Sequence, residues 1–199
     1  MKILHISDTH NKHRDLGDMP AADVLVHSGD FTMAGSDMEA LDFLEWFCDL
    51  PYKHKIFIAG NHDDCMIDAT LDGLPDNVHY LHNNGITIEG VSFYGVPMLA
   101  ELENGDMKLL TRYDLIPDNV DVLITHGAPM GILDNVNSSI HYGSSLLLDR
   151  VSAIKPKMNL FGHTHDAYGT TEWNGTIFSN AALTDWQYNL RHIPRLLSC

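Results

Sequence analysis

Residues 55–63 of this 199-residue chain read KIFIAGNHD, an apolar run followed at once by glycine, an amide, an imidazole and a carboxylate. Such a continuous apolar run is typical of a β-strand that is buried on both faces. In open α/β sheets, ligands bind beyond the carboxyl ends of the strands. We therefore expect residues 55–59 to form a strand that delivers Asn61 and His62 to a functional site.

The same arrangement recurs four times elsewhere in the chain, where an apolar run precedes a short polar motif. These further runs, which we also predict to be strands, are residues 3–6, 23–27, 120–125 and 158–161. The motifs after them supply Asp8 and His10, Asp30, His126, and His163 with His165. The D-x-H and H-x-H motifs should each present both polar side chains on one side, because alternate residues of extended backbone share a face.

Two helical patterns lie between these strands. Ser36 followed by Glu39 is a capping-box pattern, so we expect a helix to begin there and to end before Pro51. A second helix is predicted over residues 144–153, before Pro156. The alternation of strands and helices predicts an α/β fold with a largely parallel sheet.

Two further segments have the pattern of β-hairpins. They are residues 86–95 and 168–179, each with a two-residue turn that ends in glycine. Residues 98–119 have the least pattern, and we predict that they form a rim or cap over the site.

The composition favours a single domain over residues 1–199, because 44% of the residues are hydrophobic and can form a substantial core. The formal net charge is −15 and only 12 residues are Lys or Arg, so we expect no long nucleic acid as a partner. Three cysteines without a C-x-x-C pair predict reduced thiols. The chain has no membrane-length apolar stretch and no evident export signal, so we expect a cytoplasmic protein with no membrane partner.

The motifs together offer carboxylate, imidazole and amide ligands but no thiolate. This donor set suits Mn, Fe, Zn or Ni, and argues against a structural cysteine–zinc site or a pure magnesium site. A carboxylate can bridge two such ions about 3.5–4 Å apart, and metal pairs of this kind hold the attacking and leaving oxygens in phosphoester cleavage. We therefore predict two divalent or trivalent transition-metal ions as cofactors and a small phosphorylated molecule as substrate.

In order and wording, the motifs resemble those of the calcineurin-like metallophosphoesterase family. That family carries D-x-H, G-D, G-N-H-D/E, H-G and G-H-x-H, and this chain matches all five between residues 8 and 165. The sequences GDFT, ITHGAP and FGHTH resemble those of its small metallophosphoesterase-domain-containing (MPPED-like) branch. The resemblance implies a four-layer αββα sandwich with two mixed β-sheets flanked by helices. The chain departs from many members at residues 31–35, which lack a further Asp or Asn, and this argues against the phosphoprotein-phosphatase type.

The resemblance also implies a role for each motif residue. A first metal ion would be held by Asp8, His10 and His165. A second would be held by Asn61, His126 and His163, with Asp30 as the bridge between the two ions. His62 would not bind metal but would contact the phosphate and protonate the leaving oxygen, and Asp63 would fix the tautomer of His62.

Two residues outside the motifs, His141 and Asn180, are further candidates for contact with the substrate. His141 lies in the loop after the H-G motif, and Asn180 follows a predicted strand near the C-terminus. By contrast, His5 and His27 lie inside apolar strands, and we predict that they are core residues.

We predict hydrolysis of phosphoester bonds by a metal-bound hydroxide, with a small, nucleotide-like phosphodiester as the favoured substrate. The enzymatic alternatives are a phosphomonoesterase and a phosphoprotein phosphatase, and the non-enzymatic one is a metal- or nucleotide-binding scaffold with slow turnover. The acidic charge disfavours a nuclease. A metallo-β-lactamase-type hydrolase is excluded, because the H-x-H motif is followed by D-A-Y rather than by x-D-H.

Overall fold

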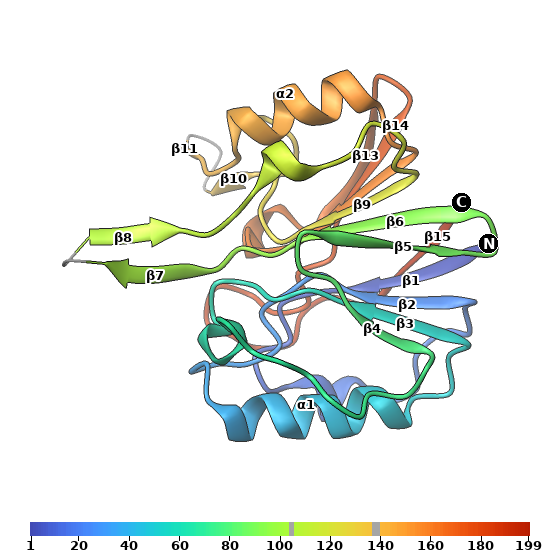
Figure 1. Cartoon of the computed structure of the whole chain (residues 1–199), viewed down its shortest axis with the longest axis vertical. Coiled ribbons are helices and arrows are strands. Elements are labelled where there is room, and N and C mark those ends of the chain that lie inside the picture. Colours follow the sequence, from blue (N-terminus) through green and yellow to red (C-terminus); the bar gives the residue numbers. More distant parts are fainter. Residues whose placement is uncertain (104–105, 137–139) are drawn as a thin grey trace.

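Two β-sheets stack face to face, and one α-helix covers the outer face of each (Figure 1). This computed structural model describes residues 1–103, 106–136 and 140–199. The layers follow the order helix, sheet, sheet, helix, so the predicted four-layer αββα sandwich with two mixed sheets is confirmed.

The first sheet has the strand order β15-β1-β2-β3-β4 and is parallel except at one edge. Its strands are β1 (Lys2–Ile6), β2 (Val24–His27), β3 (His54–Phe57), β4 (Val78–Tyr80) and β15 (Arg195–Ser198), which is antiparallel to β1. Three of these strands were predicted, with slightly shifted ends. The other two, β4 and β15, escaped prediction because β4 is very short and β15 has no continuous apolar run.

The second sheet has the order β13-β14-β12-β9-β6-β5, with antiparallel strands at both edges. Its strands are β5 (Asn84–Ile88), β6 (Val91–Val96), β9 (Val122–Thr125), β12 (Met158–Phe161), β13 (Gly169–Trp173) and β14 (Thr176–Asn180). The pairs β5–β6 and β13–β14 are antiparallel hairpins, so both hairpin predictions are confirmed.

In the described part of the chain, the two α-helices are α1 (Asp37–Asp49) and α2 (Ser145–Ile154). At the start of α1 the Ser36 hydroxyl accepts the Glu39 N–H, and the Glu39 carboxylate accepts the Ser36 N–H, so the predicted capping box is confirmed. The described residues also form short 3-10 helices, namely η1 (His13–Leu16), η2 (Asp64–Met66), η3 (Tyr113–Leu115) and η4 (His165–Ala167). Across the described ranges, no helix is long and apolar enough to cross a membrane.

Three hydrophobic clusters hold the layers together. The first lies between α1 and the first sheet, where Phe43 stacks on Phe31 with ring centroids 4.3 Å apart. The second lies between the two sheets, and the third between α2 and the second sheet. Each fully buried large apolar side chain contributes about 1.5–3 kcal/mol of transfer free energy. Because β2, β9 and β12 are buried on both faces, their sequences are mostly apolar.

Two small hairpins stand apart from the large sheets. One consists of β7 (Ala100–Glu103) and β8 (Asp106–Leu109), which pair with each other and project away from the sheets (Figure 1). The other consists of β10 (Asn135–Val136) and β11 (Ile140–His141). That residues 98–119 form a rim or cap over the site stays a prediction.

Candidate dinuclear metal site

The five motifs meet where the loops after β1, β2 and β3 of the first sheet face the loops after β9 and β12 of the second. The main-chain N–H of His163 donates to the carboxylate of Asp8 at 3.0 Å, which joins residues 155 positions apart in the sequence. The carboxyl ends of parallel strands from both sheets therefore form one site, as the topology of such sheets predicts.

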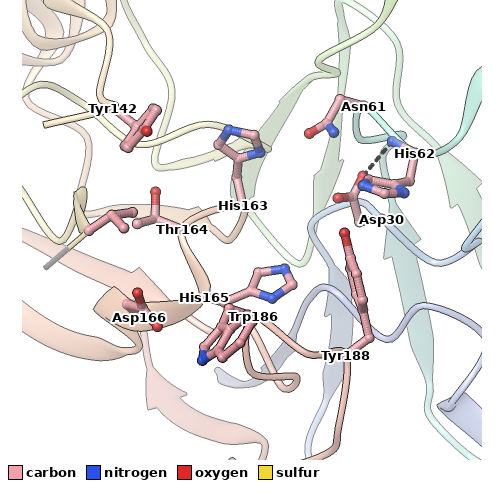
Figure 2. A pocket seen from close by; sticks show the side chains of 11 residues that line it. Asp30, Asn61, His62, Tyr142, His163, Thr164, His165, Asp166, Trp186 and Tyr188 are labelled. Carbon is pink, nitrogen blue, oxygen red and sulfur yellow. Dashed lines mark hydrogen bonds between the residues drawn. The ribbon is translucent and has the colours of Figure 1, made fainter. Parts of the chain in front are cut away.

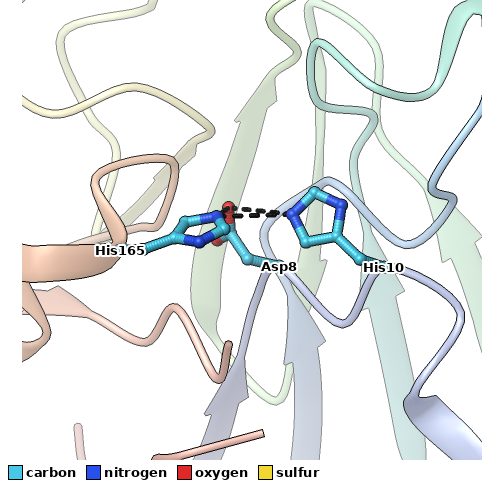
Figure 3. A group of neighbouring side chains, drawn as sticks. All are labelled: Asp8, His10 and His165. Carbon is cyan, nitrogen blue, oxygen red and sulfur yellow. Dashed lines mark hydrogen bonds and ion pairs between the residues drawn. The ribbon is translucent and has the colours of Figure 1, made fainter. Parts of the chain in front are cut away.

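Asp8, His10 and His165 form a first cluster of potential metal ligands (Figure 3). The Nε2 atom of His165 lies 3.2 Å from Oδ1 of Asp8 and 3.3 Å from Nε2 of His10. The side chains of Asp8 and His10 are buried. A carboxylate oxygen and two imidazole nitrogens at these separations fit the donor set of one transition-metal ion.

Asp30, His126 and His163 form a second cluster, with Asn61 beside it. The Nε2 atom of His126 lies 3.3 Å from Oδ2 of Asp30 and 3.1 Å from Oδ1 of Asn61. The same Oδ2 of Asp30 lies 3.7 Å from Nε2 of His10 in the first cluster. Asp30 thus reaches both clusters, which is the position that a bridging carboxylate needs.

Main-chain carbonyls orient three of the candidate ligand imidazoles through Nδ1. The pairs are His10 with Thr32 at 3.1 Å, His126 with Ser28 at 2.9 Å, and His165 with Asp185 at 2.8 Å. A carbonyl only accepts, so Nδ1 carries a proton in each ring and Nε2 is the atom available to the site. Contacts of this kind are typical of metal-binding imidazoles.

At four of the seven candidate ligands the backbone is left-handed rather than extended. The φ angles are +53° at Asp8, +41° at His10, +57° at Asp30 and +66° at His163. Such conformations cost about 1–3 kcal/mol each in non-glycine residues, and they cluster at functional sites where surrounding contacts hold them in place. The expectation of extended D-x-H and H-x-H motifs is therefore wrong, since tight turns bring these side chains together.

Two motif glycines make room for the carboxylates. A Cβ atom on Gly162 would lie 1.9 Å from Oδ2 of Asp8, and one on Gly60 would lie 2.2 Å from Oδ1 of Asp30. Any larger residue would displace a ligand oxygen. This close approach explains why glycine precedes the ligands in the G-H-x-H and G-N-H motifs.

Burial and charge together set the protonation of the site. Burial raises the pKa of Asp8, but the hydrogen bond to His165 and the neighbouring imidazoles leave that pKa well below its usual value. Burial lowers the pKa of His126, but the charge and hydrogen bond of Asp30 raise it overall to about 10. A proton on Nε2 of His126 therefore occupies the position that a cation would take, and the two compete.

His62 lies beside both clusters. A ring nitrogen of His62, a carboxylate oxygen of Asp30 and a ring nitrogen of His10 lie close enough together to hold a metal ion. Its main-chain N–H donates to Oδ1 of Asp30 at 2.8 Å, and its ring stands edge-on to that of His10 with centroids 4.7 Å apart. Its Nδ1 contacts the carbonyl of Met33 at 2.9 Å, which directs the proton of the neutral ring to Nδ1. The role of His62 as an acid rather than a ligand stays a prediction.

The expectation that Asp63 orients His62 is wrong, because the carboxylate of Asp63 binds the main chain of two loops instead. It accepts the N–H groups of Asp30 at 2.8 Å, Gly60 at 2.8 Å and Thr32 at 2.9 Å. Burial and the negative charge of Asp30 raise the pKa of Asp63 to about 7, although these N–H groups favour its ionised form. Asp63 therefore fixes the loops that carry the ligands.

The two further substrate candidates also have structural contacts. Asn180 is buried and donates through Nδ2 to the carbonyls of Thr164 and Leu133. It therefore holds the loop of the G-H-x-H motif rather than lining the cavity, and its predicted contact with substrate is wrong. His141 binds the carboxylate of Asp134 through Nδ1 at 2.8 Å, and its contact with substrate stays a prediction.

A cavity of about 300 Å³ opens beside the two clusters (Figure 2). Its lining includes Asp30, Asn61, His62, His163 and His165 among the predicted residues. It also includes residues that sequence reasoning missed, namely Val136, Tyr142, Thr164, Asp166, Trp186 and Tyr188. The pair of aromatic residues in the polar stretch 184–191 is the one sequence signal that could have identified part of this set.

The family model of the calcineurin-like phosphoesterases matches residues 1–167, which contain all five motifs. The chain belongs to this family, whose members use divalent metal ions.

Curated relatives support the same assignment. Metallophosphoesterase domain-containing protein 1 of Homo sapiens and that of Mus musculus are each 35% identical over 221 residues, covering 94% of this chain and 67% of the relative. UPF0046 protein C25E10.12 of Caenorhabditis elegans is 35% identical over 222 residues, covering 98% of this chain and 79% of that protein. The resemblance to the MPPED-like branch is therefore confirmed.

Solved structures share the fold at low sequence identity. TT1561 of Thermus thermophilus superposes with a TM-score of 0.58 at 12% identity, covering 96% of each chain. Another crystal structure superposes with a TM-score of 0.67 at 17% identity, covering 94% of this chain and 91% of the other. At these identities the likeness supports the fold alone.

Proposed function

We propose that the protein is a dinuclear metallophosphoesterase that hydrolyses small, nucleotide-like phosphodiesters. The observation that carries this proposal is the position of Asp30, whose Oδ2 atom lies 3.3 Å from Nε2 of His126 and 3.7 Å from Nε2 of His10. One carboxylate is thus shared by two donor clusters beside a cavity, and a two-metal site needs this arrangement.

Each cluster has the chemistry to hold one cation. Asp8, His10 and His165 would hold the first, Asn61, His126 and His163 the second, and Asp30 both. When bound, two such ions polarise the phosphoryl oxygens and generate the nucleophile from water. Mn, Fe, Zn and Ni are all compatible with these oxygen and nitrogen donors.

His62 is placed to act on the leaving group. It lines the cavity, and its main-chain N–H is fixed by the bridging carboxylate. A proton delivered by its imidazole to the leaving oxygen would accelerate cleavage by about 10²–10⁴-fold. That acid is most needed when the leaving group is an alkoxide, as in a nucleoside phosphodiester.

The shape of the cavity favours a diester over a monoester. A second cavity of about 1240 Å³ adjoins the first and shares Val136, Asp166 and Trp186 with it. It offers room for the second substituent on phosphorus. Trp186 and Tyr142 are exposed aromatic residues in the lining, and aromatic side chains of this kind stack on planar rings such as nucleobases. The formal charge of −15 favours a small substrate over a long nucleic acid.

The test is a paired rate measurement on metal-stripped protein refilled with Mn²⁺. The substrates are bis-p-nitrophenyl phosphate and p-nitrophenyl phosphate, with Asp30→Asn as the matched variant that removes only the bridging charge. We expect faster hydrolysis of the diester, and a loss of both activities in the variant.

The other outcomes select among the alternatives. A preference for the monoester would indicate a phosphomonoesterase or a phosphoprotein phosphatase. If neither substrate shows a metal-dependent rate, the enzymatic proposal fails and a metal- or nucleotide-binding scaffold replaces it. Metal analysis of the purified protein would identify the native ions.

A further inference from the structure

The loop of residues 184–191, which follows β14, lies against the first ligand cluster and beyond the residues that the family model matches. The Thr184 hydroxyl donates to the main-chain carbonyl of Asp8 at 2.9 Å. The main-chain carbonyl of Asp185 accepts from Nδ1 of His165 at 2.8 Å. The loop is therefore fixed to two of the metal ligands themselves.

The carboxylate of Asp185 holds the loop in place through hydrogen bonds with other residues of the same loop. It accepts the main-chain N–H groups of Gln187 and Asn189, both at 2.9 Å, and the Nε of Arg191 at 3.0 Å. These contacts hold the residue between Gln187 and Asn189 in one conformation.

That residue is Tyr188, and its φ of +61° places it in the left-handed region, as for the ligands Asp8, His10, Asp30 and His163. Its main-chain N–H donates to the carbonyl of Asp185 at 2.8 Å. A bulky aromatic residue adopts this conformation only where its surroundings hold it, and such strain is concentrated at functional sites. The loop thus directs this side chain rather than leaving it free.

The ring of Tyr188 packs on three imidazoles of the site. Its centroid lies 4.8 Å from that of His10, 5.8 Å from that of His165 and 5.9 Å from that of His62. Figure 2 shows the ring directed from the loop toward Asp30, with the hydroxyl leading. The half-buried side chain lines the cavity, and its hydroxyl has no hydrogen-bond partner in the part of the chain that the structure describes.

We propose that the Tyr188 hydroxyl donates a hydrogen bond to a non-bridging oxygen of the phosphoryl group bound at the site, which makes Tyr188 a further catalytic residue. This inference rests on the proposed function. Negative charge on the non-bridging oxygens must be stabilised during phosphoryl transfer, and a fixed donor is effective there because it needs no reorganisation. The phenol hydroxyl supplies this donor without occupying any of the side chains that would hold the metal ions. His62 and Tyr188 would then serve different oxygens of the same phosphoryl group.

The test compares Tyr188→Phe with the wild type. This variant keeps the ring against His10 and removes only the hydroxyl. Tyr80→Phe is the matched control, because the Tyr80 hydroxyl on β4 is buried without a partner among the described residues and does not line the cavity. We expect kcat/KM of Tyr188→Phe on bis-p-nitrophenyl phosphate to fall by about 10- to 100-fold, as for a lost hydrogen bond to a charged group. Tyr80→Phe should retain the wild-type rate.

Two binding measurements separate a catalytic donor from a merely structural ring. Mn²⁺ affinity of Tyr188→Phe, measured by calorimetric titration, should match that of the wild type. The affinity of the Mn²⁺-loaded variant for inorganic phosphate should fall by about tenfold. Unchanged phosphate affinity, or a matching loss of Mn²⁺ affinity, would overturn the inference.

The phosphate measurement also distinguishes this inference from the proposed function. If the wild type hydrolyses neither nitrophenyl ester, the proposed function fails, but phosphate binding still reports on the Tyr188 hydroxyl. If the wild type is active and Tyr188→Phe equals Tyr80→Phe in both rate and phosphate affinity, the inference alone fails.

Discussion

At Gly162, a single added methyl group would collide with the carboxylate of Asp8, because the Cβ would lie 1.9 Å from Oδ2. We expect Gly162→Ala to weaken Mn²⁺ binding by at least about tenfold through displacement of this ligand. Gly169→Ala is the control, since its Cβ would make only ordinary van der Waals contacts, with the Leu133 side chain at 3.4 Å and the Ala167 carbonyl oxygen at 3.8 Å. Calorimetric titration would measure the Mn²⁺ affinity of both variants. Wild-type affinity in Gly162→Ala would refute the close approach of Gly162 to the Asp8 carboxylate.

The role of His62 can be tested through the leaving group. We expect His62→Gln to slow hydrolysis of a diester with an alcohol leaving group by about 10²–10⁴-fold, and that of a p-nitrophenyl ester far less, since nitrophenolate needs little protonation. The measurement is kcat on both substrates at saturating Mn²⁺. Equal losses would exclude the acid role, and a lost equivalent of bound Mn²⁺ would indicate that His62 is a ligand.

At the scale of the elements, one buried side chain, Asp63, holds the loops after β2 and β3 together. In Asp63→Asn, an amide NH₂ would face main-chain N–H groups that now donate to the carboxylate. We expect the free energy of unfolding to fall by about 1–3 kcal/mol and Mn²⁺ affinity to fall with it. Urea denaturation and Mn²⁺ titration would measure these changes.

The neighbouring Asp64→Asn is a matched control, because Asp64 is exposed and its substitution makes the same change of charge. Wild-type stability and wild-type Mn²⁺ affinity in Asp63→Asn would contradict the loop-fixing role of Asp63.

At the scale of the whole molecule, His5 joins the two sheets. Its ring, fully buried on β1, contacts Ser28 beyond β2 and Ser179 on β14, each at 2.9 Å. Burial lowers the pKa of His5 to about 3, well below its value in the unfolded chain. Below the pKa that His5 has in the unfolded chain, the unfolded state binds a proton that the native state does not bind. The free energy of unfolding therefore decreases as the pH falls.

For the metal-free protein, this linkage predicts a loss of about 1 kcal/mol from His5 alone between about pH 7.5 and about pH 5.5. We expect His5→Gln, whose amide does not titrate, to show a pH dependence of unfolding that is smaller by this amount. Urea denaturation at both pH values would measure it. Equal pH dependence in the two proteins would show that the pKa of His5 is not lowered in the native state.

Much of this protein follows from its sequence alone. The runs that become β2, β9 and β12 are mostly apolar because both faces are buried, and the capping box at Ser36 is a local contact between residues three apart. The donor types in the five motifs limit the metal ions that the site could hold, because ligand chemistry belongs to the residue and not to its surroundings. These features are encoded within short windows of sequence.

Only the tertiary structure decided which side chains serve which purpose. Asp63 and Asn180 turned out to hold loops, since their partners come from segments that no spacing rule connects to them. The left-handed backbone at four of the candidate ligands is stable only because surrounding contacts hold it. Tyr188 reaches the site because Thr184 binds Asp8 across 176 positions of sequence, a contact that exists only once both sheets are assembled.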